Sequence, residues 1–197
     1  GTVTGVQTCA LPISHEDNPY CASTPVTDGR RVVVWHGSAG LYCYDLEGTQ
    51  QWSRDLGEFR HTWGYASSPV LHQGRVILNC GPGKRVFLAA FDLKTGKTLW
   101  ETDEPFEGDG QRNENNAYMG SWTTPVVARV AGHDQILCSM PTRVVGYEPD
   151  TGKILWWCNG LRHDRGDLAY SSPIVQGDIC FVTGGYRGPA MAFRSEE

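Results

Sequence analysis

A short phrase recurs at regular intervals along this chain, and it restricts the fold more than any other feature of the sequence. Each copy runs from an aspartate through a glycine-containing turn to a tryptophan four residues after the glycine. The copies end at Trp52, Trp100 and Trp156, which are 48 and 56 residues apart. A step of two small residues and a proline opens each unit, and these prolines are Pro25, Pro69, Pro125 and Pro173. Units of this length are typical of β-propeller repeats.

Each unit contains four short segments that are rich in strand-forming residues. In the second unit they cover residues 68–71, 75–80, 86–92 and 98–102, and Gly96 lies in the tight turn before the last segment. No helical periodicity persists over a dozen residues, which excludes a helical solenoid. A β-sandwich is the alternative, but a sandwich does not need the same turn and tryptophan in every unit.

We therefore predict an all-β fold, namely a β-propeller fragment with three complete four-stranded blades and one incomplete blade in an open arc. The expected blades cover about residues 23–56, 67–103, 123–158 and 171–193. The tryptophan should cover the neighbouring blade, because one sheet of four strands buries too little apolar surface alone. The predicted docking residues are Trp52, Trp100, Trp156, Gly48, Gly96, Gly152, Asp45, Asp92 and Asp150.

Both termini read as translated laboratory sequence. Residues 3–13 match an in-frame translation of a short-read sequencing adapter, and residues 194–197 match the reverse complement of such an adapter's inner end. Arg194 also stands where the repeat requires an aspartate after Phe193. We expect residues 1–13 and 194–197 to be non-native, and residues 14–193 to be an internal piece of a longer protein.

Charge and cysteine usage narrow the functional class. The formal net charge is −5, and Lys and Arg are scattered singly, which argues against nucleic acid as a partner. No apolar run approaches the ~20 residues that span a bilayer. The cysteines outside the predicted adapter residues show neither CxxC spacing nor Cys/His clustering, so we expect mostly buried thiols and no zinc site.

The segment Ala90–Trp100 resembles the tryptophan-docking repeat of the quinoprotein-like propellers, the PQQ-repeat family. This resemblance covers the units from Ser23 to Phe193, and the family includes PQQ-dependent alcohol dehydrogenases as well as non-catalytic exported proteins. The phrases Trp63–Pro69 and Asn79–Gly83 look most like the second group, whose members are similar to the outer-membrane-barrel assembly lipoprotein. The resemblance implies a non-catalytic binding or scaffolding module in the periplasm or cell envelope, with a protein or peptide partner. The alternative is part of a PQQ-dependent dehydrogenase.

The alternative would require PQQ, calcium and a catalytic aspartate, so we looked for oxygen ligands. The best cluster is Glu107, Asp109 and residues 113–116, which lie in an insertion of eight residues between the second and third units. The cluster lacks the alternating spacing of a calcium loop and reads as a solvated acidic loop. The adjacent cysteines of the family's dehydrogenases are absent. We therefore predict no catalytic residue, no metal and no cofactor.

The connections between successive units carry the best candidates for a ligand site, because in a propeller they all open on one face. They combine arginine, histidine and an aromatic residue before the next strand, as peptide or anion sites do. The alternative is that the aromatics pack the central channel while the charges solvate loops. The serines that recur before Pro69 and Pro173 indicate hydrogen bonding at the strand start rather than a nucleophile. The candidate ligand-binding residues are Arg60, His61, Trp63, Arg112, Asn115, Trp122, Arg162, His163 and Tyr170.

Overall fold

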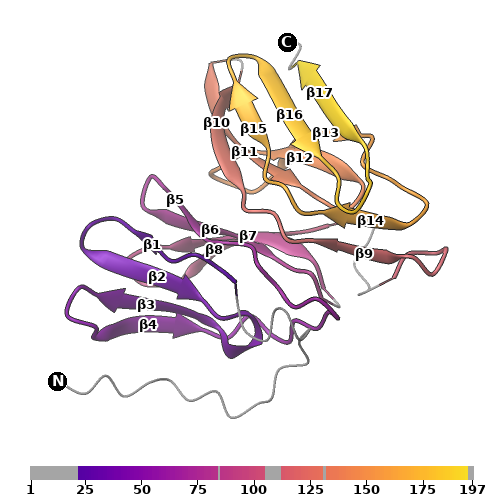
Figure 1. Ribbon diagram of the computed structural model, residues 1–197. Coiled ribbons are helices and arrows are strands. Elements are labelled where there is room, and N and C mark those ends of the chain that lie inside the picture. The colour runs from indigo at the N-terminus through magenta and orange to yellow at the C-terminus, as the bar shows by residue number, and fades with distance from the viewer. Residues whose placement is uncertain (1–21, 84, 105–111, 131, 195–197) are drawn as a thin grey trace.

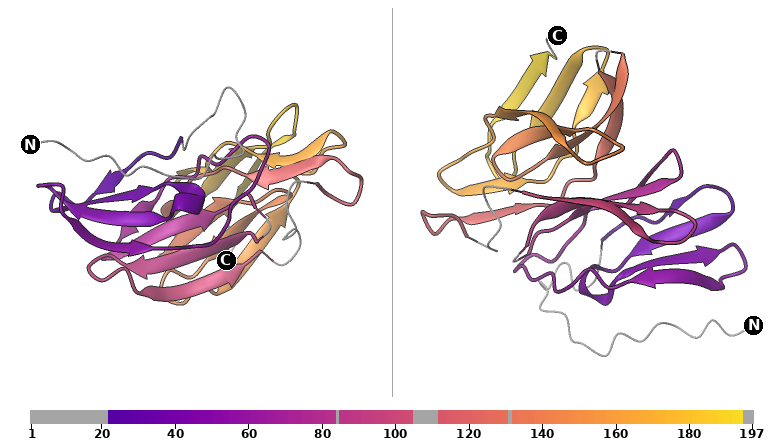
Figure 2. Two further views of the ribbon diagram at one scale, coloured as in Figure 1. Left: turned by 90° about the horizontal axis from the view of Figure 1, so that it is seen from below. Right: turned by 180° about the vertical axis from the view of Figure 1, so that it is seen from behind.

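Strands and turns make up nearly all of the protein that this computed structural model describes, which is residues 22–83, 85–104, 112–130 and 132–194. The one helical turn among them is the 3-10 turn Gly37–Ala39 (η1). Four of the five sheets follow one another in chain order as an open arc, and the fifth is a pair of parallel strands (Figure 1). Figure 2 shows the first and the last sheet at opposite ends of that arc.

The four sheets are antiparallel meanders, hydrogen-bonded in sequence order. Blade 1 consists of β1 (Val26–Thr27), β2 (Arg31–Trp35), β3 (Leu41–Asp45) and β4 (Gln50–Arg54). Blade 2 consists of β5 (Val70–His72), β6 (Arg75–Cys80), β7 (Phe87–Asp92) and β8 (Thr98–Asp103). Blade 3 consists of β10 (Val126–Val130), β11 (His133–Ser139), β12 (Arg143–Tyr147) and β13 (Ile154–Asn159). Blade 4, as described, has three strands: β15 (Ile174–Gln176), β16 (Ile179–Thr183) and β17 (Ala190–Arg194).

This arrangement confirms the predicted fold class. In the second unit the expected strand 68–71 is observed as β5, two residues later at its start, because the N–H of Ser68 bonds to the next blade instead of to its own sheet. The expected adapter-derived residues 1–13 lie outside the described residues, as do Glu107 and Asp109 of the acidic loop. Of the expected C-terminal adapter residues, Arg194 is described; it ends β17 and pairs with Asp178 at 3.0 Å.

The hydrophobic core lies between the blades. Side chains alternate between the two faces of each strand; we call the face toward the preceding blade the front face and the face toward the following blade the back face. In blade 2 the back face packs against blade 3 through Ile77 and Ala90. The front face packs against blade 1 through Val76, Leu78, Ala89 and Phe91. Every interior blade is thus covered on both faces.

The cysteines that lie in strands fill these interfaces as small apolar groups. Cys43, Cys80, Cys138 and Cys180 are buried free thiols, whereas Cys158 is partly exposed. Burial raises the pKa of Cys138 to about 12 and that of Cys180 to about 11. Both thiols therefore stay protonated at neutral pH, and the predicted structural role of the strand cysteines is confirmed.

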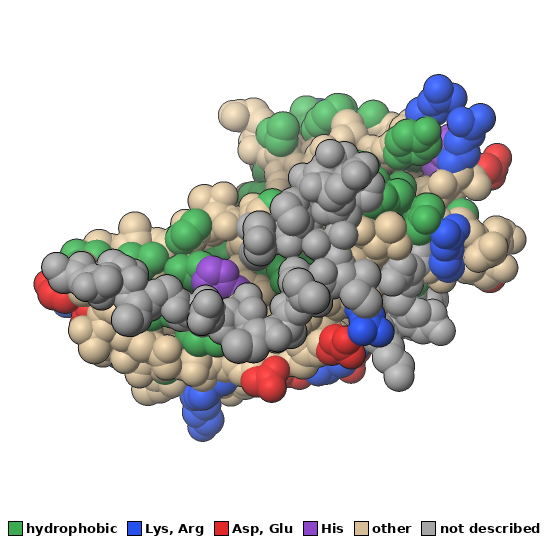
Figure 3. All heavy atoms as spheres, turned by 60° about the horizontal axis from the view of Figure 1, so that its bottom comes forward, with side chains coloured by type: hydrophobic (Ala, Val, Ile, Leu, Met, Phe, Trp, Pro, Cys, Tyr) green, Lys and Arg blue, Asp and Glu red, His purple; other side chains and the backbone are tan. Residues whose placement is uncertain are grey.

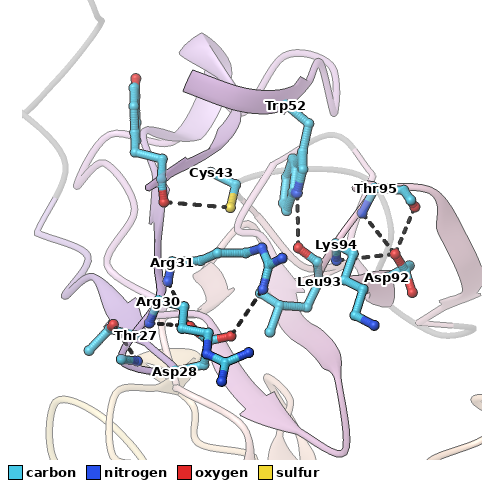
Figure 4. Close-up of polar contacts among 12 residues, drawn as sticks. Thr27, Asp28, Arg30, Arg31, Cys43, Trp52, Asp92, Leu93, Lys94 and Thr95 are labelled. Atoms are coloured by element: carbon cyan, nitrogen blue, oxygen red, sulfur yellow. Dashed lines mark hydrogen bonds and ion pairs between the residues drawn. The ribbon is translucent and has the colours of Figure 1, made fainter. Parts of the chain in front are cut away.

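The tryptophan docking is observed at the first two joints of the arc. The Trp52 indole crosses from blade 1 to blade 2, where its Nε1–H donates to the Leu93 carbonyl at 3.0 Å (Figure 4). The Trp100 indole reaches Pro149 of blade 3 in the same way, at 3.0 Å. Both side chains are buried, with 7% and 8% exposure.

Each docked indole lies on the glycine of the turn in the next blade. A Cβ added to Gly96 would come within 2.6 Å of Trp52, and one added to Gly152 would come within 2.3 Å of Trp100. Both glycines also have positive φ, at 67° and 71°. Glycine is therefore needed for two reasons: the turn requires a positive φ, and the indole leaves no room for a Cβ atom.

The acid of the turn keeps its place in the second unit but moves in the third. Asp92 accepts hydrogen bonds from the N–H and the hydroxyl of Thr95, and these bonds lower the pKa of its carboxyl group (Figure 4). In the third unit Glu148 accepts the equivalent pair from Thr151, not the expected Asp150. Glu148 stands four residues before the turn glycine, as Asp92 does. The distance from the glycine therefore determines which acidic side chain accepts these hydrogen bonds. Asp150 instead pairs with Arg75 of blade 2.

The third tryptophan differs from the other two. Trp156 is only partly buried, and its Nε1–H donates to Gln135 Oε1 of its own blade at 2.7 Å. It packs edge-on against Phe193 of blade 4, with ring centroids 5.8 Å apart. Blade 4 as described ends at β17, so no glycine turn of that blade receives this indole.

Candidate functional site

The segments that join successive blades meet on one side of the arc. Two of them contribute β9 (Tyr118–Ser121) and β14 (Gly166–Ala169), which pair in parallel across the joint between blades 3 and 4. Figure 1 shows this pair lying side by side along the base of blades 3 and 4. The N–H of Trp122 continues the pairing by donating to Ala169 at 2.9 Å. Two connections are thereby held as one layer, as the sequence predicts for a common face.

Aromatic rings from these connections form a continuous cluster. Trp63 lies 4.5 Å from Tyr118 and 6.0 Å from Trp122, measured between ring centroids. Trp122 in turn packs edge-on against Tyr170 at 5.2 Å. The indole N–H of Trp122 donates to the carbonyl of Gly64 at 2.9 Å, which fixes its ring between the connections. The predicted aromatics Trp63, Trp122 and Tyr170 are therefore brought together.

These three rings line an open cavity of about 440 Å³, which we call the aromatic pocket. Its remaining walls are Ala66, Thr124 and Ser172, all from the small residues that precede the first strands. Tyr170 is the most accessible ring, with 44% exposure, whereas Trp122 is 8% exposed. The pocket thus offers apolar ring surface together with hydroxyl groups.

The small residues before each proline form a string of hydrogen bonds from blade to blade. The N–H of Thr24 donates to the Ser68 hydroxyl at 2.9 Å, and the N–H of Ser68 donates to the Thr124 hydroxyl at 3.1 Å. The N–H of Thr124 donates to the Ser172 hydroxyl at 3.0 Å. This hydroxyl string confirms the expected hydrogen bonding at the strand starts and shows that it joins neighbouring blades.

The hydroxyl string leaves donors available at the pocket. Thr124 Oγ1 and Ser172 Oγ each accept one backbone N–H, and within the described parts of the chain neither hydroxyl donates. A hydroxyl that accepts one bond can still donate its hydrogen. The aromatic pocket therefore presents O–H donors that suit a carbonyl or carboxylate oxygen of a ligand.

His61 has a different position from the one expected of a ligand-binding residue. It is 1% exposed, its Nδ1 accepts the N–H of Trp63 at 3.2 Å, and its Nε2 bonds the Met119 carbonyl at 3.0 Å. Burial lowers its pKa to about 4, so the ring is neutral at pH 7. Because Nδ1 accepts, the proton must reside on Nε2. His61 holds two connections together underneath Trp122, whose ring it meets edge-on at 4.8 Å.

The predicted arginines lie at the edges of this layer and already have partners. Arg60 pairs with Glu58 at 3.1 Å, and Arg162 pairs with Glu114 at 2.8 Å, with all four side chains more than half exposed. The guanidinium of Arg112 lies 3.5 Å from the centroid of the Tyr118 ring. None of the three lines the aromatic pocket. Exposed pairs of this kind contribute little to stability, because water screens the two charges.

The two remaining predicted residues serve the loops that carry them. Asn115 is exposed, and its N–H donates to Asn113 Oδ1 at 3.0 Å. His163 is partly buried, and its Nδ1 accepts the N–H of Arg165 at 3.2 Å. Figure 3 shows Lys and Arg side chains in small separate groups on the face in view, without a continuous basic stripe. The charged members of the predicted set therefore do not converge as the aromatic members do.

Sequence reasoning missed the lining residues Ala66, Thr124 and Ser172. Counting back from each proline would have found them, since Ala66 stands three residues before Pro69, as Trp122 and Tyr170 do before theirs, and Thr124 and Ser172 stand directly before their prolines. Tyr65, four residues before its proline, packs against Trp35 instead and donates to His36 at 3.1 Å.

The residues that line the aromatic pocket restrict which ligands it can bind. The described lining carries no carboxylate, so it does not fit a calcium-bound quinone. No group of three or more His, Cys, Asp or Glu side chains in the described ranges is arranged to hold a metal ion. Across the same ranges, no helix is long and apolar enough to span a membrane.

Meandering blades joined by docked tryptophans place this chain in the class of tryptophan-docking β-propellers. The chain belongs to the PQQ_2 family, whose model is described as "Outer membrane protein assembly factor BamB" and matches residues 13–197. No curated protein matches the chain by sequence.

Solved structures share the fold at low sequence identity. BamB from Moraxella catarrhalis is similar with a TM-score of 0.61 and 16% identity, over 89% of this chain and 48% of that one. A europium-containing methanol dehydrogenase matches with a TM-score of 0.51 and 17% identity, over 76% of this chain and 26% of that one. The C-terminal domain of PilY1 from Pseudomonas aeruginosa has a TM-score of 0.51 and 18% identity, over 77% of this chain and 35% of that one. The chain thus spans less than half the length of these structures.

Proposed function

We propose that this chain is a non-catalytic binding or scaffolding module that holds a protein or peptide partner at the aromatic pocket. One observation carries the proposal: rings from three separate connections, Trp63, Trp122 and Tyr170, converge on one open cavity. Clustered tryptophan and tyrosine side chains are typical of the energetic centres of protein interfaces. The similarity to BamB supports a partner among envelope proteins and a location in the periplasm or cell envelope.

The donor set of the pocket favours an uncharged, extended peptide segment. An apolar side chain of the peptide would cover the rings, while its backbone carbonyls would accept from the hydroxyls of Thr124 and Ser172. An anionic ligand is less favoured than the sequence indicated, because Arg60 and Arg162 are ion-paired and lie outside the pocket lining. A partner of this kind binds through ring contact and main-chain hydrogen bonds.

The test compares two exposed tyrosines near the same end of the chain. Tyr170→Ser removes a pocket ring that is 44% exposed, whereas Tyr186→Ser removes a ring that is 62% exposed and does not line the pocket. Peptides selected from a random displayed library on the wild-type chain are titrated by tryptophan fluorescence. We expect Tyr170→Ser to weaken binding about tenfold, since ring contacts contribute roughly 0.5–1.5 kcal/mol beyond their area. Tyr186→Ser should bind like the wild type; equal loss in both variants would contradict the proposal.

A second function is favoured by the likeness to the methanol dehydrogenase, namely part of a PQQ-dependent quinoprotein. That function requires PQQ with calcium, for which the aromatic pocket lacks carboxylate ligands among the described residues. PQQ that stays bound with calcium through gel filtration would favour this function over the binding module.

A further inference from the structure

The hydrogen-bonding groups of the aromatic pocket are mainly donors. Besides its rings, the polar side chains of the described lining are Thr124 and Ser172, and each hydroxyl oxygen already accepts a backbone N–H of the chain. Neither hydroxyl hydrogen has an acceptor within the parts of the chain that the structure describes. A hydroxyl in this state completes its hydrogen bonding by donating. The lining therefore fits a ligand that is rich in acceptors and poor in donors.

Proline is the residue that gives a peptide this balance of acceptors and donors. Every residue of a peptide supplies a carbonyl acceptor, and every residue except proline also supplies an N–H donor. An N–H that enters the pocket gives up its water and is costly to leave without an acceptor. A proline-rich segment keeps the carbonyls and removes those donors, so it matches the lining better than an ordinary peptide does.

The rings of the pocket are inclined to one another rather than stacked. The planes of Trp63 and Trp122 meet at 46°, and those of Trp122 and Tyr170 meet at 65°. Aromatic-lined surfaces bind proline-rich segments in the polyproline II conformation. This helix has three residues per turn, so its pyrrolidine rings point in three directions and can contact separate walls of the pocket.

The pocket is also small for a peptide site. Its open cavity of about 440 Å³ has six described lining residues, so little contact area is available to offset the entropy that a peptide loses on binding. A polyproline segment is extended and stiff before it binds, because proline fixes φ and its side chain has no rotamer freedom to lose. Such a segment therefore loses less entropy in the pocket than other peptides do.

Building on the peptide-binding function proposed above, we propose that the aromatic pocket holds a proline-rich segment of its partner in the polyproline II conformation. Pyrrolidine rings of the segment contact Trp63, Trp122 and Tyr170, and its carbonyls accept from the hydroxyls of Thr124 and Ser172. The pocket distinguishes the hand of the helix, because its walls come from three different connections and form a chiral surface.

Two octapeptides of opposite handedness test this on the full chain. Capped octaproline of L-residues and its D-residue mirror image have the same rings and carbonyls, but only the first forms a left-handed polyproline helix. Each carries a fluorophore and is titrated by fluorescence anisotropy, beside a capped octapeptide of alternating alanine and glutamine, in which every residue has an N–H. We expect the L-proline peptide to bind at least about tenfold more tightly than either control, because one or two hydrogen bonds are enough for that ratio.

Variants of the chain show where the peptide binds. Tyr170→Ser should weaken binding of L-octaproline about tenfold. Tyr186→Ser should bind like the wild type, because the Tyr186 ring is 62% exposed and does not line the pocket. Circular dichroism shows whether each variant is folded. If Tyr170→Ser loses its β signal, Ala66→Glu replaces it, since a glutamate at this position would fill the cavity and repel the carbonyls of the peptide.

The outcomes separate a proline preference from peptide binding in general. Equal binding of the L- and D-peptides would overturn the proposal, because the rings would then hold apolar groups whatever the shape of the helix. Binding of L-octaproline that persists in the Tyr170 or Ala66 variant would place the site elsewhere and overturn it as well. If library peptides without proline bind at the pocket and octaproline does not, the proline preference is wrong and the peptide-binding function stands. If no peptide binds, both are wrong.

Discussion

The glycines under the docked indoles allow the cost of a blade joint to be measured apart from the cost of the turn. Gly152→Ala introduces two penalties. The φ of 71° is unfavourable for alanine, which costs about 1–2 kcal/mol, and the new Cβ would lie 2.3 Å from Trp100 Cε3. Displacing a packed indole is overpacking, for which we expect a further ~1–3 kcal/mol. Gly48→Ala is the matched control, because Gly48 has a φ of 84° but no atom within 4 Å of the added Cβ.

Urea unfolding of the two variants gives the difference in free energy of unfolding. Gly152→Ala should be less stable than Gly48→Ala by the overpacking cost alone, and Gly96→Ala should behave like Gly152→Ala because Trp52 lies 2.6 Å from its added Cβ. In a Trp100→Leu background the excess at Gly152 should largely disappear, since the indole that collides is gone. Equal losses at Gly48 and Gly152 would refute the docking argument.

A buried histidine and a buried ion pair give further predictions. His61 has its pKa lowered to about 4, below the 6.5 of an unfolded histidine, so the unfolded chain binds more protons between these values. Stability should therefore be complete above pH 6.5 and fall by up to about 3 kcal/mol as the pH drops to 4, and His61→Phe should flatten that slope in urea titrations at pH 7 and 5. The Arg143–Glu104 ion pair is buried between blades 3 and 2, with side-chain exposures of 2% and 0%. Arg143→Met alone should cost about 3–5 kcal/mol in the same assay, and adding Glu104→Gln should recover part of the loss; no recovery would show that the two groups are not coupled.

The fold could be predicted because its signal is local and repeated. Gly96 and Trp100 stand four residues apart, and the same spacing recurs in each unit, although each indole contacts the glycine of the next blade. The site was predicted only in part. The residue type indicated the position of the aromatic side chains, but not that of the charged ones. Trp122 and Tyr170 reach the pocket, but His61 is turned inward by its bond to Met119, 58 residues away. Partners that are distant in sequence, such as Arg162 and Glu114, cannot be paired from a single chain.

The two sets of contacts at each joint lie at different distances from the centre of the arc, and together they fix its curvature. Near the centre, neighbouring blades are linked by a single short bond, such as the one from Ser68 N–H to the Thr124 hydroxyl at 3.1 Å. At the outer strand a whole indole separates them, as Trp100 does between blades 2 and 3. Each joint is therefore a wedge, thin inside and thick outside. The angle between neighbouring blades therefore depends on the residue types at both of these positions.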